Sequence, residues 1–289
     1  GSETRVAYFG TDGSPAYGAD GYAGWTVEYD EQGNKTRVAY FGTDGSPAYG
    51  ADGYAGWISE YDEQGNRVRV SHFGADGEPA LLPNGYTGWT SEYDKQGNEV
   101  KVTYFGLDGE PVFTRDGYAS RTAQYDAYGN QTGEAFFGMD DEPVLADLID
   151  ISSWTAEYDA HRNRTRVSYF GPYGKAALCV DDYAECATEY DERGNIVKES
   201  YFGTDGELTL CRDGYAERNA EYNEQGNLIK ESYLGTNGAA LVSGEMASAA
   251  KGTDFGSLLC GAARTNVFSI TNAGSMALTI GGVSTSGTG

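Results

Sequence analysis

Apolar and polar positions alternate over short segments of this chain, and turn residues separate the segments. The first clear pair covers residues 25–29 (Trp-Thr-Val-Glu-Tyr) and 36–41 (Thr-Arg-Val-Ala-Tyr-Phe), with Asp-Glu-Gln-Gly-Asn in residues 30–34. Alternation with a period of two predicts β-strands, and Asp, Gly and Asn predict a turn, because Gly adopts positive φ and Asp and Asn bind their own backbone. The stretch therefore predicts a β-hairpin.

The register of this hairpin follows from keeping the apolar side chains on one face, since a shift of one residue would scatter them over both faces. The predicted cross-strand pairs are Val27 with Val38, Trp25 with Tyr40, Tyr29 with Thr36, and Glu28 with Arg37. The opposite-charge pair, which contributes about 0.2–1 kcal/mol, recurs in later copies as Glu60 with Arg69, Glu92 with Lys101, Glu157 with Arg166, Glu189 with Lys198, and Glu221 with Lys230. In one copy Gln124 replaces the acid and Gly133 replaces the base opposite it. A physical contact between the two positions predicts this joint loss.

The hairpin belongs to a tandem repeat. The motif Tyr-Phe-Gly, with some variation, recurs at residues 8, 40, 72, 104, 136, 169, 201 and 233, a spacing of 32 residues with one step of 33. Residues 3–34 and 35–66 are nearly identical, whereas the fifth unit departs most, with Ala-Asp-Leu-Ile-Asp-Ile-Ser-Ser at residues 146–153 and Arg162 in place of the turn Gly. The rest of each unit, Asp-Gly twice with Pro between, predicts two turns around a short extended piece.

Each unit depends on its neighbours for stability, because an isolated two-stranded hairpin is marginal in water. We therefore expect an all-β fold, an elongated, solenoid-like or spiral sheet of stacked 32-residue hairpins, roughly 70 Å long at two strand spacings per unit. Stacking would bury a structural seam of aromatic side chains, made of Trp25, Tyr29, Tyr40, Trp57, Tyr61, Trp89, Tyr93, Tyr104, Tyr125, Trp154, Tyr158, Tyr169, Tyr190, Tyr201 and Tyr222.

Three segments follow from this pattern. Residues 1–238 hold about seven repeats, and residues 239–252 are rich in small residues and predict a linker or short helix. Residues 253–289 have a different β pattern, with candidate strands at 266–271 and 277–283. The first residues are in register with a hairpin turn, so we expect a natural N-terminus and any signal peptide to lie upstream; alternatively, Gly-Ser is an expression remnant.

The turn motif carries a resemblance. Tyr-Asp-x-x-Gly-Asn begins at residues 29, 61, 93, 125 and 190, with degraded forms at 158 and 222. It resembles the tyrosine–aspartate (YD) repeats of rearrangement-hotspot and teneurin-type proteins, and the resemblance covers residues 1–238. It implies spiralling hairpin sheets on large secreted or surface proteins, in some cases a shell around a toxin. The 32-residue period is longer than the unit of that family, roughly twenty residues, which puts the closed shell in doubt.

Residues 253–283 resemble the start of a choice-of-anchor D (Hydin-like) immunoglobulin-type domain, a module of exported bacterial proteins. That resemblance implies an Ig-like β-sandwich, which needs about 100 residues and seven strands. The residues present supply only part of it, so either the molecule was truncated here or a partner supplies the missing strands by β-addition.

Charge limits the partners. The net charge is −24, and such a surface repels nucleic acid and anionic membranes, so we expect neither as a partner. No apolar run is long enough to span a bilayer, so we expect no membrane insertion.

The four cysteines are interpreted as free thiols, because Cys179 and Cys211 occupy one slot in adjacent units, about 9–10 Å apart, which is too far for a disulfide.

No catalytic constellation is visible in the sequence, and we expect a non-enzymatic protein without a cofactor. His72 and His161 are interpreted as replacements at repeat positions, and the carboxylates follow the repeat instead of converging. Weak calcium candidates are the turn aspartates Asp12, Asp20, Asp44 and Asp52, although Asp-Gly is also the ordinary turn signature.

Three functional hypotheses result. The first is an extracellular or cell-surface bacterial repeat protein, a stalk, adhesin shaft or filament segment that contacts copies of itself or other surface proteins. The second is a module that binds cell-wall or host glycans through exposed Trp and Tyr. The third is the carrier part of a polymorphic toxin, which requires a toxic domain downstream.

Overall fold

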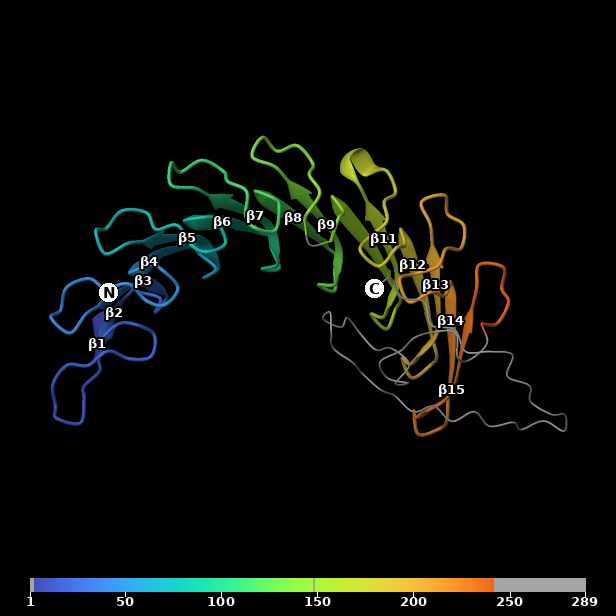
Figure 1. Ribbon diagram of the computed structural model, residues 1–289, viewed down its shortest axis with the longest axis horizontal. Coiled ribbons are helices and arrows are strands. Elements are labelled where there is room, and N and C mark those ends of the chain that lie inside the picture. The colour runs from blue at the N-terminus through green and yellow to red at the C-terminus, as the bar shows by residue number, and fades with distance from the viewer. Residues whose placement is uncertain (1–2, 148, 242–289) are drawn as a thin grey trace, which may run out of the picture. The chain divides into compact units, whose positions relative to one another are not determined.

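The computed structural model describes residues 3–147 and 149–241 (Figure 1). Fifteen antiparallel strands form one sheet, and their order in the sheet is their order in the sequence. The strands are β1 (Glu3–Ala7), β2 (Gly24–Tyr29), β3 (Lys35–Phe41), β4 (Gly56–Tyr61), β5 (Arg67–Phe73), β6 (Gly88–Tyr93), β7 (Glu99–Phe105), β8 (Ser120–Tyr125), β9 (Gln131–Phe137), β10 (Ser153–Tyr158), β11 (Arg164–Phe170), β12 (Glu185–Tyr190), β13 (Ile196–Phe202), β14 (Glu217–Tyr222) and β15 (Leu228–Leu234).

Stacking of hairpins edge to edge is confirmed. Each hairpin, such as β2–β3, pairs through its second strand with the first strand of the next hairpin, β4. The sheet is open, because β1 and β15 stand at the two ends of the order. Within the described residues the single helical element is the 3-10 turn Pro172–Gly174, and none of that part of the chain forms a helix long and apolar enough to cross a membrane.

The predicted register holds over most of each hairpin. Val27 lies opposite Val38, Trp25 opposite Tyr40, and Glu28 opposite Arg37. Every later hairpin keeps the same offsets, including Gln124 opposite Gly133.

One predicted pair is wrong: Tyr29 lies opposite Lys35 and not Thr36. A β-bulge between Glu28 and Tyr29 shifts the register by one residue, and all the described hairpins repeat it. The turn causes the shift, because Asp30 N donates to Asn34 O at 3.0 Å and closes the loop one residue early. Thr36 is the extra residue, and its hydroxyl donates to Glu28 O at 3.3 Å.

The connection between hairpins continues the sheet instead of leaving it. Phe41 forms a β-bridge with Pro47, and Tyr40 N donates to Ala55 O at 2.7 Å just before β4 begins. The same bridge recurs along the chain at residues 9, 73, 105, 137, 170, 202 and 234. Adjacent connections also touch, since Ala51 N donates to Asp20 O at 2.8 Å.

All described strands belong to this one sheet, so within the described residues neither face has a second sheet or a helix over it. Alternation assigns Trp25, Val27 and Tyr40 to one side, here the aromatic face, and Glu28 and Arg37 with the following Phe column to the other, here the charged face. The aromatic face carries the core: Val27 is 1% exposed. Large side chains lying along the sheet cover small ones between them.

The fifth unit is irregular, as its sequence predicts. Ala146 N donates to Ile151 O at 2.9 Å, so this turn is one residue longer than the one closed by Gly18 N and Tyr22 O, and Asp150 takes a positive φ of 54° within it. Ile151 is 2% exposed and fills a slot that holds Tyr in the neighbouring units. Arg162, which replaces the turn Gly, takes a positive φ of 69°, the conformation that Gly adopts in the other copies.

The repeat pattern persists to the last described residues, because Ala240 bridges Leu234 and Leu241 N donates to Tyr233 O at 2.8 Å. The remainder of the predicted linker at 239–252 and the whole predicted Ig-like segment at 253–289 lie outside the described residues. Their assignments therefore stay predictions.

Candidate functional site

A ladder of stacked rings runs along the aromatic face. Rings at the position of Tyr40, in the second strand of each hairpin, alternate with rings at the position of Tyr22, in the connection between hairpins. The first position, the second-strand slot, was expected in the seam. The second position, the connection slot, was not. Consecutive ring centroids lie 4.3 to 6.2 Å apart. Its members are Tyr8, Tyr22, Tyr40, Tyr54 and His72; then Tyr86, Tyr104, Tyr118 and Phe136; then Tyr169, Tyr183, Tyr201, Tyr215 and Tyr233.

The connection slot escaped detection because Asp-Gly-Tyr has the composition of a turn, and no period-two alternation marks the Tyr. Its recurrence with the 32-residue period at residues 54, 86 and 118 was the available signal. Burial raises the pKa of the Tyr22 and Tyr118 phenols, and that of Tyr215 to about 12. Adjacent rings add about 0.5–1.5 kcal/mol per pair beyond their buried area.

Four Tyr residues of the Tyr-Asp turns make a hydrogen bond to the preceding hairpin, a role that was not predicted. Tyr93 donates its hydroxyl to Arg67 O of the preceding hairpin at 3.1 Å, so it ties two units together at the turn end of the sheet. Tyr61, Tyr158 and Tyr190 make the same bond to residues 35, 131 and 164. These residues are tethers between units, whereas stacking belongs to the other two Tyr slots.

The Asp of the same motif organises the turn. Asp94 Oδ1 accepts from Gln96 N and Asn98 N, both at 2.9 Å, and Asn98 Nδ2 donates to Asp94 Oδ2 at 2.8 Å. The hydrogen bond from the Asn98 side chain is the main cause of a lowered Asp94 pKa. The motif therefore closes the hairpin loop with an ionised, internally satisfied carboxylate.

The predicted charge pairs are only partly formed. Ion pairs join Glu28 with Arg37 (3.8 Å), Glu157 with Arg166 (3.8 Å) and Glu221 with Lys230 (2.5 Å). No ion pair joins Glu60 with Arg69, Glu92 with Lys101, or Glu189 with Lys198 in the described part of the chain. Lys198 instead pairs with Glu217 of the next unit at 2.7 Å. Register brings the charges to adjacent positions, but a long side chain can choose a neighbour on either side.

The Trp column is interrupted by ion clusters that sequence reasoning missed. Trp25, Trp57, Trp89 and Trp154 are half-buried, but two later units carry Arg in this slot. Arg121 contacts Glu99 at 2.5 Å and Glu134 at 2.9 Å. Arg218 likewise contacts Glu199 at 3.0 Å and Glu231 at 2.8 Å. The available signal was that Glu134 and Glu231 stand where the first three units have Val.

A groove opens where the ring ladder is broken. No ring contact joins His72 to Tyr86 within the described residues, and a groove of about 490 Å³ lies there. We call it the ladder groove; it is lined by Asp52, Tyr54, Trp57, Arg67, Val70, His72, Leu82, Pro83, Asn84, Tyr86 and Trp89. Two half-buried indoles, two phenols and four polar side chains thus line one groove. The other break, near Ile151, is filled by that buried side chain.

His72 holds its position through its ring nitrogen, since Nδ1 lies 3.0 Å from Thr87 O. Burial lowers its pKa below 6.5, so the ring is neutral at physiological pH. The interpretation of His72 as a replacement at a Tyr position agrees with its place in the ladder, stacked edge-on against Tyr54 at 4.8 Å.

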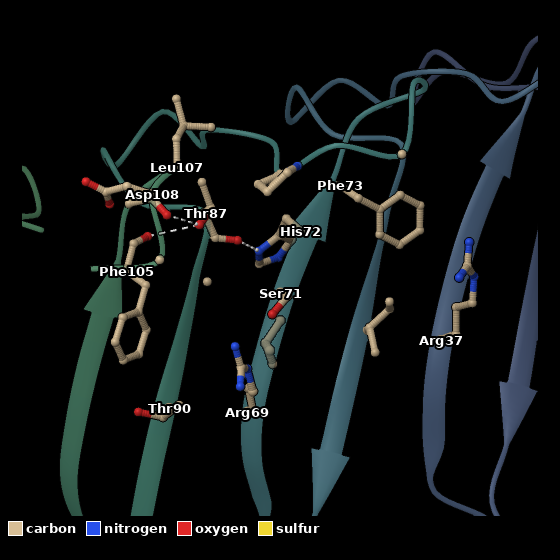
Figure 2. Close-up of a pocket in the computed structure, with 17 residues that line it drawn as sticks. Arg37, Arg69, Ser71, His72, Phe73, Thr87, Thr90, Phe105, Leu107 and Asp108 are labelled. Atoms are coloured by element: carbon tan, nitrogen blue, oxygen red, sulfur yellow. Dashed lines mark hydrogen bonds between the residues drawn. The ribbon is translucent and has the colours of Figure 1, made fainter. Parts of the chain in front are cut away.

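A second groove lies on the charged face of the same unit, between Phe73 and Phe105 (Figure 2). We call it the cradle groove; its volume is about 640 Å³. Arg37, Arg69, Ser71, Thr90 and Leu107 are among its lining residues. Figure 2 shows Phe105 and Phe73 on opposite sides of Ser71 and Arg69.

The calcium candidates serve their own turns. Asp12 Oδ1 accepts from Ser14 N and Oγ at 3.0 and 2.7 Å, and Asp44 does the same with Ser46. Asp20 accepts from the Tyr22 hydroxyl at 3.4 Å, and Asp52 lies at the ladder groove. Among the described residues no three His, Cys, Asp or Glu side chains gather in a geometry suited to a metal ion.

Three of the cysteines are buried free thiols: Cys179, Cys186 and Cys211. Burial raises the pKa of Cys186 to about 11, which makes it a poor nucleophile. Cys260 lies outside the described residues. His161 sits in an exposed turn, where its backbone N donates to Asp159 Oδ1 at 2.8 Å.

No protein-family model and no curated protein matches the sequence. Among solved structures, the crystal structure of TcdB2-TccC3 aligns with 73% of this chain and 12% of its own, at 13% identity and a TM-score of 0.29. The Photorhabdus luminescens Tc holotoxin pore aligns with 80% of this chain and 13% of its own, at 12% identity and a TM-score of 0.28. The chain thus spans 12–13% of the length of these proteins. TM-scores this low assign it neither an architecture nor a function.

Proposed function

We propose that this chain is a non-enzymatic structural segment of a bacterial surface protein, a stalk, adhesin shaft or filament part. One observation carries the proposal: the same bonds join consecutive units through most of the described array. Strand pairing, the Tyr tether, the ring ladder and the bond between adjacent connections all cross the boundary between units. The side chains that make these bonds hold each unit to the next, as in other repeat proteins.

The chemistry of the turns supports the same role. The carboxylates of the Asp turns accept hydrogen bonds from their own loops, which leaves them committed to the fold. Within the described residues the thiols are buried and His72 is held neutral. The Tyr-Asp-x-x-Gly-Asn turn, present with the same capping bonds in successive hairpins, supports kinship with YD-repeat proteins of the cell surface. Expected partners are further copies of the chain or other surface proteins.

Deletion of one period tests the structural role. Removing residues 35–66 joins β2 to β5 in the same register, so the chain should fold with one unit fewer. The longest dimension in solution scattering should fall by up to roughly 10 Å, two strand spacings. The control deletes residues 35–50, which removes one strand only, reverses the strand alternation and should prevent folding. An unchanged longest dimension after the 32-residue deletion would overturn the proposal.

The ladder groove favours glycan binding as a second candidate. Trp57 and Trp89 present half-buried rings beside Asp52, Arg67 and Asn84, and flat aromatic surfaces with nearby polar groups suit sugar rings. A glycan array on the intact chain, followed by Trp fluorescence titration, tests it. Trp89→Ala should abolish any signal, whereas Trp25→Ala, in the same slot outside the groove, should leave it unchanged. An array without hits removes this candidate.

A further inference from the structure

On the charged face, each of the first two hairpins contains an aromatic cradle with three parts. Glycine forms the floor: a Cβ placed on Gly24 would lie 2.4 Å from the Phe41 ring, and one on Gly56 would lie 2.5 Å from the Phe73 ring. The Phe ring therefore lies directly on the backbone. An arginine covers it from above, since Arg5 Cζ is 4.3 Å from the Phe41 centroid and Arg37 Cζ is 4.8 Å from that of Phe73.

The third hairpin has the glycine floor, the arginine and the Phe, but the Phe105 ring does not lie as close to the glycine. The nearest atoms to a Cβ on Gly88 are Val70 O at 2.3 Å, Ser71 Cα at 3.1 Å and Val70 C at 3.2 Å, and the Phe105 ring is not among them. No cation–π contact joins Arg69 to Phe105 in the described part of the chain. The Phe105 ring therefore does not press onto Gly88 as the Phe41 and Phe73 rings press onto Gly24 and Gly56.

The volumes of equivalent grooves agree with this difference. The groove one unit earlier is lined by the corresponding residues and has Phe73 over Gly56; its volume is about 280 Å³. The cradle groove, where Phe105 does not lie over Gly88, measures about 640 Å³. A volume of this size is typical of small-molecule sites.

The charge at this groove is unusual for the protein. Arg69 is exposed and has no ion pair among the described residues, although Glu60 lies opposite it in the register. Arg37 also lines the groove. The rim carboxylate, Asp108, already accepts from Glu110 N at 3.0 Å. An uncompensated guanidinium beside an empty ring position suits a ligand that combines an aromatic ring with an anion.

We propose that the cradle groove binds a small aromatic carboxylate. The ring lies over Gly88, in the place that Phe73 occupies over Gly56, and its carboxylate pairs with the Arg69 guanidinium. Two sibling cradles in the same sheet show that a phenyl ring fits this floor beneath an arginine. The site lies on the face opposite the ladder groove and is independent of the structural role.

The test uses the full chain and N-acetylphenylalanine as the probe, with the Gly88 amide signal followed by NMR. Binding should shift that signal. N-acetylphenylalanine amide, which lacks the carboxylate, and N-acetylalanine, which lacks the ring, should each bind at least threefold more weakly, a difference of about 0.7 kcal/mol. Equal binding of acid and amide would overturn the proposal, as would no shift at all.

Two matched pairs of variants locate the site. Arg69→Gln should weaken binding at least threefold, whereas Lys101→Gln, the same slot one unit later, should not. Thr90→Trp should fill the groove and abolish binding, whereas Thr122→Trp should leave it intact. Retained affinity in Thr90→Trp would place the ligand elsewhere and overturn the assignment.

Discussion

Two kinds of boundary between units occur in the same sheet, one with an apolar cross-strand pair and one with an ionic pair. Where β3 meets β4, and β5 meets β6, a Val lies opposite a Trp: Val38 opposite Trp57 and Val70 opposite Trp89. Where β13 meets β14, Glu199 lies opposite Arg218. Both boundaries keep identical strand offsets, so the backbone tolerates an apolar pair or an ionic pair in one slot.

At both ionic boundaries the Arg that replaces Trp is accompanied by two Glu side chains. Arg121 has Glu99 and Glu134 as partners, and Arg218 has Glu199 and Glu231. Burial alone would lower the pKa of Arg218, but its hydrogen bonds to Glu231 and Glu199 outweigh burial and raise it. A charge in this half-buried position is costly unless it is paired, so substitution at one site requires substitution at its neighbours.

The largest expected effect breaks an ionic boundary. Arg121→Met leaves Glu99 and Glu134, which are 27% and 18% exposed, facing each other without a cation. The free energy of unfolding, measured by urea titration, should fall by about 2–4 kcal/mol. The triple variant Arg121→Trp, Glu134→Val, Glu99→Lys recreates the apolar boundary of the second unit and should recover most of the loss. A single variant as stable as the parent would contradict this account.

An intermediate effect should follow from repairing the ladder. His72→Tyr restores the ring of the other units and should raise the free energy of unfolding by about 1 kcal/mol. It should also remove a pH dependence. Because burial lowers the folded-state pKa of His72, the unfolded chain binds more protons below pH 6.5, and stability falls as the pH drops from there towards the folded-state value.

Urea titrations at neutral pH and at about pH 5 measure both effects, because the unfolded-state pKa of His lies between them. His161→Tyr in the exposed turn is the control for the substitution and should leave the free energy of unfolding at neutral pH unchanged. If His72→Tyr keeps the acid sensitivity of the parent between these pH values, another group causes it.

The smallest effect concerns the tether between units. Tyr93→Phe removes the hydrogen bond to Arg67 O, and the free energy of unfolding should fall by about 0.5–1 kcal/mol. Tyr125→Phe is the matched control, because the Tyr125 hydroxyl makes no hydrogen bond in the described part of the chain. Equal losses in the two variants would show that the tether does not contribute.

Much of the fold could be predicted because its determinants are local and repeat. Alternation around Val27 and Val38 sets the hairpin register, and a period of 32 residues sets the stacking. The bulge at Tyr29 was missed because the loop from Asp30 to Asn34 closes through its own hydrogen bonds, which alternation does not show. The two grooves were missed because one depends on how His72 packs at a Tyr position and the other on where the Phe105 ring lies, and both depend on neighbours in space.

By itself, the sequence determined which residues alternate, where the turns fall and which charges stand opposite one another, because these depend on contacts within a few residues or across one hairpin. The tertiary structure alone decided which rings stack, which Glu each Arg or Lys selects, and where the ladder and the cradle stand open. Those outcomes depend on the packing of long side chains from adjacent units, where several partners lie within reach and small differences in free energy select among them.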